Sequence, residues 1–120
     1  MANEISLDVR FSVNNGNLVF NHSPGTVRID QAAIGGPTPG YSSIGTAEES
    51  VSFSELSTAG WLVLQNLDST NFVDWGFSTG TYGGRLEAGE QAAFRLKPST
   101  TLYLKADTAA CGVQILAFED

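Results

Sequence analysis

Side chains that could do covalent or acid–base chemistry are scarce in this sequence. Among its 120 residues there is one histidine, His22, and one cysteine, Cys111. A Ser–His or Cys–His nucleophile would have to use His22, which lies in the turn-like run Asn21-His22-Ser23-Pro24. Serines are numerous, but no Gly-x-Ser-x-Gly elbow surrounds any of them. We therefore expect His22 to be a solvated turn residue, and we expect no catalytic residue and no enzyme activity.

Metal and cofactor chemistry is equally poorly supplied. One His and one Cys cannot build the multi-His centre of a cupin or a multi-Cys zinc site. The best set of oxygen ligands, Asp68-Ser69-Thr70-Asn71 with Asp74, lacks the acidic spacing and terminal Glu of an EF-hand, and its residue types are common in turns. The Gly-rich runs at 76–80 and 82–84 open no helix and hold no Gly-Lys-Ser/Thr motif for phosphate. We expect no metal and no cofactor, with calcium in the Asp68 loop as the alternative.

The charge balance limits the classes of partner. Six Lys and Arg against thirteen Asp and Glu give a net charge of −7, so nucleic acid is not an expected partner. No apolar stretch is long enough to cross a membrane, and Glu4 and Asp8 stand where a secretion signal would need basic and then apolar residues. Cys111 lies in an apolar run and is expected to be a buried thiol, as suits a chain made in a reducing cytoplasm.

The elements that would carry any site are strands. Apolar residues occupy every odd position of the run 5–13 and polar residues every even one, which is typical of a strand with one buried face. Asn14-Asn15-Gly16-Asn17 follows, and because Asn-Gly is the strongest short hairpin signal, Leu18 and Phe20 are expected on a return strand. Further strands are expected around 26–30, 51–53, 61–64, 72–77, 94–96, 102–104 and 113–117.

This spacing of strands indicates an all-β protein. The strands are short, Gly, Pro, Asn, Asp and Ser separate them, and no segment shows sustained helical periodicity. We expect one domain over residues 1–120, an antiparallel β-sandwich of about eight or nine short strands. The single Cys excludes the Cys–Trp–Cys signature of immunoglobulin domains, and a jelly-roll-like arrangement fits the number of strands best.

One segment does not fit a compact sandwich. Residues 31–49 are rich in Gly and other small residues and contain two nearby prolines. A structureless connection of this length is uncommon inside a small domain, so we consider two interpretations, a meandering surface loop and an arm that pairs with a neighbouring subunit. In the second interpretation the contact residues would be Ile34, Pro37, Pro39, Tyr41 and Ile44.

The aromatic residues leave a carbohydrate-binding interpretation open. Trp61 and Trp75 lie in apolar strand runs and are expected to anchor the core. Tyr41 and Tyr82 lie in Gly-rich segments, which makes them better candidates for a surface contact with a protein or a glycan.

The second half of the chain has a recognisable order of motifs. Residues 60–68 form an apolar strand that ends in Asn, 71–76 a strand that ends in Gly, and 85–90 a Leu-x-x-Gly-Glu turn, before two alternating strands and the apolar run 113–119. In this order, over about the last sixty residues, the sequence resembles the small β-sandwich virion proteins of tailed bacteriophages. These motifs are turn and packing signals rather than catalytic ones.

The resemblance implies a structural role in a virion that assembles in the host cytoplasm. The expected function is that of a capsid cement or decoration subunit, which binds across adjacent subunits of the major capsid protein and stabilises the shell. Homo-oligomers are expected, and trimers would suit local symmetry axes. The first strand, the 31–49 segment and the C-terminal strand are the expected contact pieces, together with Tyr82. The alternatives are a neck or tail component and a carbohydrate-binding, lectin-like module.

Overall fold

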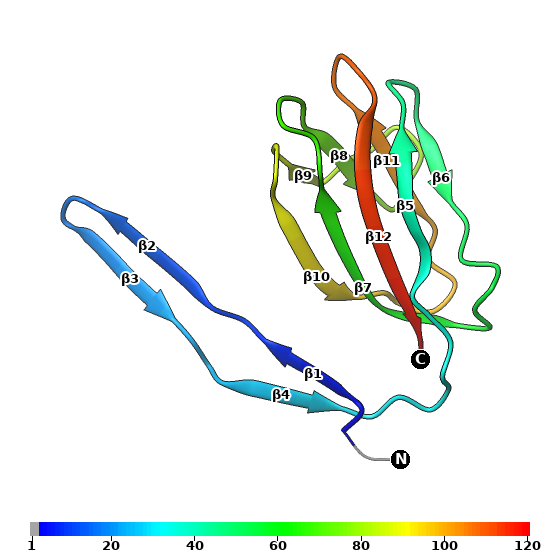
Figure 1. Ribbon diagram of the computed structural model, residues 1–120, viewed down its shortest axis with the longest axis horizontal. Helices are drawn as coiled ribbons and strands as arrows, with labels where there is room; N and C mark the ends of the chain where they lie inside the picture. The colour runs from blue at the N-terminus through cyan, green and yellow to red at the C-terminus, as the bar shows by residue number, and fades with distance from the viewer. Residues whose placement is uncertain (1–2) are drawn as a thin grey trace. The chain divides into compact units, whose positions relative to one another are not determined.

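The computed structural model describes residues 3–120, and every regular element in that range is a β-strand (Figure 1). The predicted all-β class is confirmed. Contacts divide the chain into two compact units, 1–32 and 33–120, where the sequence pattern predicted one domain.

The first unit is a two-stranded antiparallel ribbon. β1 (Ile5–Asp8) pairs with β4 (Thr26–Ile29), and β2 (Phe11–Asn15) pairs with β3 (Leu18–His22). The turn between β2 and β3 has two residues, and Gly16 within it has a φ of 57°, a value that glycine adopts without strain. The hairpin predicted from the Asn-Gly signal is therefore confirmed.

The second unit is a β-sandwich of two four-stranded sheets. Its strands are β5 (Thr38–Ile44), β6 (Glu49–Val51), β7 (Ala59–Asn66), β8 (Val73–Gly76), β9 (Gly84–Leu86), β10 (Gln91–Arg95), β11 (Leu102–Ala106) and β12 (Cys111–Glu119). One sheet has the order β10-β7-β12-β5 and the other β6-β11-β8-β9. All neighbouring strands are antiparallel, so the predicted antiparallel sandwich is confirmed.

Alternation along the central strands builds the core. In β7 and β12 every second residue is buried, and the facing strand β11 buries its own alternate residues. The largest fully buried side chains are Ile44, Leu62, Leu64, Leu102, Leu104, Ile115, Val73, Val113, Asn66 and Cys111. Cys111 is buried as predicted, and desolvation raises the pKa of its thiol, which keeps it protonated and unreactive.

The segment 31–49 differs from its prediction. Its middle part, Thr38–Ile44, is the edge strand β5, which pairs with β12 over its whole length from Thr38 opposite Ala117 to Ile44 opposite Cys111. Pro39 is compatible with a strand here because an edge position leaves one side of the backbone unpaired. The Pro and Gly content of residues 38–44 therefore marks an edge strand, with non-strand connections at residues 31–37 and 45–48 on either side of it.

The C-terminal strand also departs from its expected role as a contact piece. β12 lies between β7 and β5, so both of its hydrogen-bonding edges are occupied within the sandwich. It cannot add a partner strand to the sheet.

Candidate functional site: interaction surfaces

The described residues offer little for catalysis. No group of three or more His, Cys, Asp or Glu side chains that could hold a metal ion occurs among residues 3–120. His22 lies at the end of β3, where its ring stacks on that of Phe20 with centroids 6.4 Å apart. No helix in this part of the chain is long and apolar enough to cross a membrane.

The predicted calcium alternative falls on a loop whose carboxylate already has partners. One oxygen of Asp68, Oδ2, accepts hydrogen bonds from the backbone N–H groups of Thr70 at 2.9 Å and Asn71 at 2.6 Å. These bonds lower the pKa of Asp68 because they favour its charged form. The loop is an Asp-centred turn, and its acidic residue serves the backbone.

The ribbon has one apolar face. Cross-strand pairs on that face are Ile5 with Ile29, Leu7 with Val27, Phe11 with His22, Val13 with Phe20 and Asn15 with Leu18. Residues paired in this way lie on the same side of an antiparallel ribbon, and Val9 continues the alternation between β1 and β2. The pairs in between are polar apart from Val19, and they form the opposite face.

An irregularity in the middle of the ribbon keeps this face continuous. Between the two paired segments, residues 9–10 on one strand lie opposite residues 23–25 on the other, two residues against three. Because side chains alternate with a period of two, an equal count would place Val27 and Ile29 on the polar face. The extra residue, in the Ser23-Pro24-Gly25 stretch, returns them to the apolar one.

The side chains of this face are largely in contact with solvent. Of the ten large hydrophobic residues classed as exposed among residues 3–120, six belong to the ribbon, and Phe20 keeps 50% of its surface exposed. Five of the six ribbon residues lie on the apolar face, namely Val9, Phe11, Leu18, Phe20 and Val27, and the sixth, Val19, lies on the polar face. A contiguous apolar surface of this kind marks an interaction site.

The two tryptophans have different surroundings. Trp75 packs against the core, and its ring stacks on Phe94 with centroids 5.0 Å apart, so its predicted role is confirmed. Trp61 does not anchor the core, because Leu62 and Leu64 take the inward positions of β7 and Trp61 lies half-buried on the outer face. The guanidinium of Arg95 lies 5.5 Å from the centre of the Trp61 ring.

The predicted contact residues do not form one patch. Ile34 is 95% exposed and Tyr41 65% exposed, and Pro37 and Pro39 are also exposed. Ile44 is a core residue with 2% of its surface exposed, and together with Pro39 it lines a pocket of about 170 Å³ beside β6. It is the inward-facing end of β5, and the interpretation of that segment as a loop or an arm concealed its orientation.

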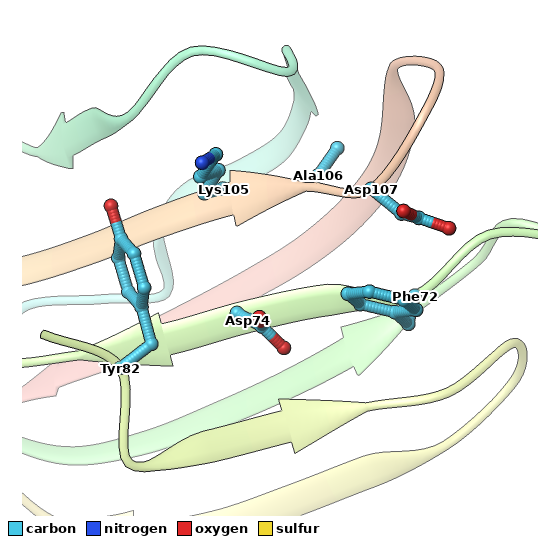
Figure 2. Close-up of a pocket in the computed structure, with 6 residues that line it drawn as sticks. All are labelled: Phe72, Asp74, Tyr82, Lys105, Ala106 and Asp107. Atoms are coloured by element: carbon cyan, nitrogen blue, oxygen red, sulfur yellow. The ribbon is translucent and has the colours of Figure 1, made fainter. Parts of the chain in front are cut away.

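Tyr82, the sixth predicted contact, lines a pocket on the second sheet. The pocket has a volume of about 170 Å³ and is lined by Phe72, Asp74, Tyr82, Lys105, Ala106 and Asp107. In Figure 2, Asp74 lies between Tyr82 and Phe72, while Lys105 and Ala106 come from the neighbouring strand β11 and Asp107 from just beyond its end. The lining therefore combines two aromatic rings with charges of both signs.

Hydrogen bonds and an ion pair order this pocket. The Tyr82 hydroxyl donates a 2.5 Å hydrogen bond to Glu48 Oε1, which raises the pKa of Tyr82 to about 12 and lowers the pKa of Glu48. Asp74 holds Arg85 through two hydrogen bonds, of 2.6 and 3.1 Å, and the Arg85 guanidinium lies 3.7 Å from the centre of the Phe72 ring. Tyr82 and Asp74, two of the polar residues that line the pocket, thus have partners within the protein.

Comparisons of the chain with protein-family models, with curated proteins and with solved structures found no match. The functional argument therefore rests on these surfaces. The sequence predicted the ribbon only in part. The alternation of residues 5–13 predicted an apolar face, but we expected this face to be buried within a sandwich.

Proposed function

We propose that this protein is a non-enzymatic structural component of a virion, a capsid cement or decoration subunit that binds across adjacent subunits of the major capsid protein and stabilises the shell. The observation that carries the proposal is that the chain has two different parts. The sandwich contains a complete hydrophobic core, and the ribbon has an apolar face with exposed side chains. Such a chain is suited to acting through assembly with other molecules.

The ribbon supports an assembly role because it is not self-sufficient. A two-stranded ribbon buries little apolar surface and is marginally stable by itself in water. Its outer edges also carry backbone N–H and C=O groups that another strand can pair with. A ribbon of this kind gains stability when it packs against a further protein surface.

The sandwich supports the proposal through its strand order. The chain passes from one sheet to the other between β5 and β6, β6 and β7, β7 and β8, β9 and β10, β10 and β11, and β11 and β12. Eight strands connected in this way favour the jelly-roll arrangement, an architecture that is common in viral capsid proteins. The sequence resemblance to phage virion proteins covers strands of this same unit.

Charge is distributed unevenly in a way that agrees with a protein partner. The ribbon unit has three acidic residues and two basic ones, which leaves a net charge of −6 for residues 33–120 out of −7 for the chain. An acidic sandwich would be attracted to a basic patch on the shell and repelled by packaged nucleic acid.

Purified virions provide the test. Mass spectrometry with copy counting is expected to find hundreds of copies of this chain per particle, as an order of magnitude for a component that repeats over a shell. Particles assembled without the chain are expected to lose their contents at a lower temperature, and addition of the purified chain should restore the original temperature. A copy number of about a dozen or fewer would support a neck or tail component instead, and absence from virions would refute the proposal.

A carbohydrate-binding function is the second candidate, and the pocket at Tyr82 is the observation that favours it. Aromatic rings beside carboxylates and a lysine can stack on a sugar ring and bind its hydroxyl groups. A glycan array followed by titration of tryptophan fluorescence would identify a ligand, and Tyr82→Ala should abolish its binding while Tyr41→Ala, on the other sheet, should not. An array without signals would refute the carbohydrate-binding function and leave the structural role as the remaining candidate.

A further inference from the structure

We propose that the apolar face of the ribbon packs against the same face of the ribbon in a second copy of this chain, so that ribbons pair at the centre of a homo-oligomer. The inference deepens the proposed function, since the oligomer would be the unit that attaches to the shell. Only this attachment to the shell rests on the proposed function. The ribbon geometry carries the pairing itself.

The composition of the face is suited to pairing with a copy of itself. Its members are hydrophobic from end to end, apart from Asn15 at the turn and His22, which stacks on Phe20. No Asp, Glu, Lys or Arg lies on it, so two such faces can meet without burying an unpaired charge. A two-fold pairing requires a self-complementary surface, and a uniform apolar face is one.

The polar face has the opposite character. It holds Ser6 opposite Arg28, Asp8 opposite Thr26 and Ser12 opposite Asn21, and the Arg28 guanidinium donates a 3.3 Å hydrogen bond to Ser6 Oγ. Charged and hydroxyl-bearing side chains of this kind belong in water. The ribbon therefore has the two-sided pattern of a half-sandwich that lacks its second layer.

The charge distribution of the ribbon permits a second copy on this face. An electrostatically selected partner requires charges to recognise, and the apolar face offers none. The ribbon unit has a net charge of only −1, so two ribbons repel each other weakly although the rest of each chain has −6.

The area of the face is sufficient for a specific contact. Nine apolar side chains lie on it, namely Ile5, Leu7, Val9, Phe11, Val13, Leu18, Phe20, Val27 and Ile29. Five of them are 46–57% exposed and the other four are half-buried, so the face offers on the order of 600 Å² per copy, the upper end of the range for the largest apolar patch on a monomer. A pair of faces would bury about 1,200 Å², which is at the lower bound of stable protein–protein interfaces.

Two adjacent residues of β3 provide a matched test of the proposal. Phe20 lies on the apolar face and Val19 on the polar face, and both are exposed, by 50% and 64%. Light scattering coupled to size exclusion should find the full-length chain in a dimer. Phe20→Ser should raise the dissociation constant by about a hundredfold or give monomers, whereas Val19→Ser should leave the mass unchanged.

Several results would overturn this pairing. A monomeric full-length chain would do so, including one in which the ribbon docks on its own sandwich, and so would equal effects of the two substitutions. Tryptophan emission from Trp75 in the core shows whether each variant has a folded sandwich, which separates lost association from lost folding.

Particle binding separates this inference from the proposed function. A monomer that nevertheless occupies virions would refute the ribbon pairing and leave the structural role in place. An oligomer that depends on Phe20 but is absent from virions would refute the structural role and leave the ribbon pairing in place.

Discussion

Asn66, the last residue of β7, holds together the loops at one end of the sandwich. Its side-chain Nδ2 donates to the backbone oxygens of Asn71 at 2.9 Å and Leu86 at 3.0 Å, and its Oδ1 accepts from the backbone N–H of Asp68 at 3.0 Å. The residue is fully buried, so these bonds replace those that water would make. The side chain of Asn66 thus makes the hydrogen bonds that these backbone groups cannot form with another strand, because the strands separate at this end of the sandwich.

Removing this amide should destabilise the sandwich. Asn66→Ala leaves the two carbonyl groups and the Asp68 N–H without their partner, and buried polar groups left unpaired cost about 1–3 kcal/mol each. We expect the free energy of unfolding to fall by about 3 kcal/mol in urea denaturation. Thr70→Ala, in the same loop but exposed, is the control and should change it by less than about 0.5 kcal/mol. Equal effects of the two would contradict the role given to Asn66.

The Tyr82–Glu48 pair makes a prediction about pH. The hydrogen bond to Glu48 favours the protonated phenol and raises the pKa of Tyr82 to about 12, while an ordinary tyrosine titrates near 10. Because the folded pKa is the higher one, the stabilisation is fully present below about pH 10 and is lost as pH rises through about 12. For Glu48 the pKa is lowered, so its contribution is present above the usual pKa of a glutamate and is lost as pH falls.

Near-ultraviolet absorbance of tyrosinate measures this shift directly. One of the three tyrosines should titrate at about 12 in the native chain, and Glu48→Gln should bring that transition down toward 10 by removing the negative charge. Glu49→Gln, at the neighbouring residue, should leave it in place. Tryptophan emission recorded in parallel confirms that the chain is still folded, and an unchanged titration in the Glu48 variant would refute the coupling.

Neither contact was visible in the sequence, and the reason is the same for both. Tyr82 and Glu48 are 34 residues apart, and the Asn66 amide reaches a carbonyl 20 residues away. Local patterns report which residues share a face of a strand, not which loops meet at its end. The Gly-rich segment around Tyr82 predicted a surface position for this residue, but nothing in the sequence indicated that Glu48 would be its hydrogen-bond partner.

Among the elements, the strands with regular alternation were predictable and the others were not. β7 and β12 are buried at every second position, and most of the residues at these positions are apolar. β5 has the same buried ends, but Pro39 and Gly40 stand in its interior, and these residues usually mark loops. Its edge position is what permits them, and an edge position is a property of the sheet rather than of the strand.

The hairpin of β8 and β9 allows a prediction with a neighbouring control. Gly84 lies opposite Trp75, and the indole ring lies across it where a Cβ atom would be. Gly84→Ala should therefore push the ring off its stack with Phe94 and lower the free energy of unfolding by about 2 kcal/mol. At Gly83 a Cβ atom would meet nothing within 4 Å, so Gly83→Ala should change stability by less than about 0.5 kcal/mol.

Tryptophan fluorescence during urea unfolding measures both glycine variants, because the ring concerned is one of only two tryptophans in the chain. A shift in native-state emission that occurs in Gly84→Ala alone would identify the displaced ring. Equal stability of the two variants would show that the hairpin yields to admit the methyl group.

At the scale of the whole molecule, the sequence predicted the sandwich but not the division into two units. Residues 5–30 have alternating apolar residues just as the sandwich strands do, and alternation predicts a face that is buried without naming what buries it. No element of the ribbon itself covers this face, since five of its nine apolar residues are exposed and the other four are half-buried. The partner of a face is a property of tertiary or quaternary structure.

This division predicts that the sandwich folds without the ribbon. Every member of the core cluster lies between Ile44 and Ala117, so a chain shortened to residues 33–120 keeps its whole core. We expect its free energy of unfolding to stay within about 1 kcal/mol of the sandwich transition in the full chain, with the same tryptophan emission. If the ribbon pairs copies as inferred, the short chain should also be monomeric where the full chain is not. A short chain that fails to unfold cooperatively would show instead that the ribbon stabilises the sandwich, and that burial of its apolar face begins within one molecule.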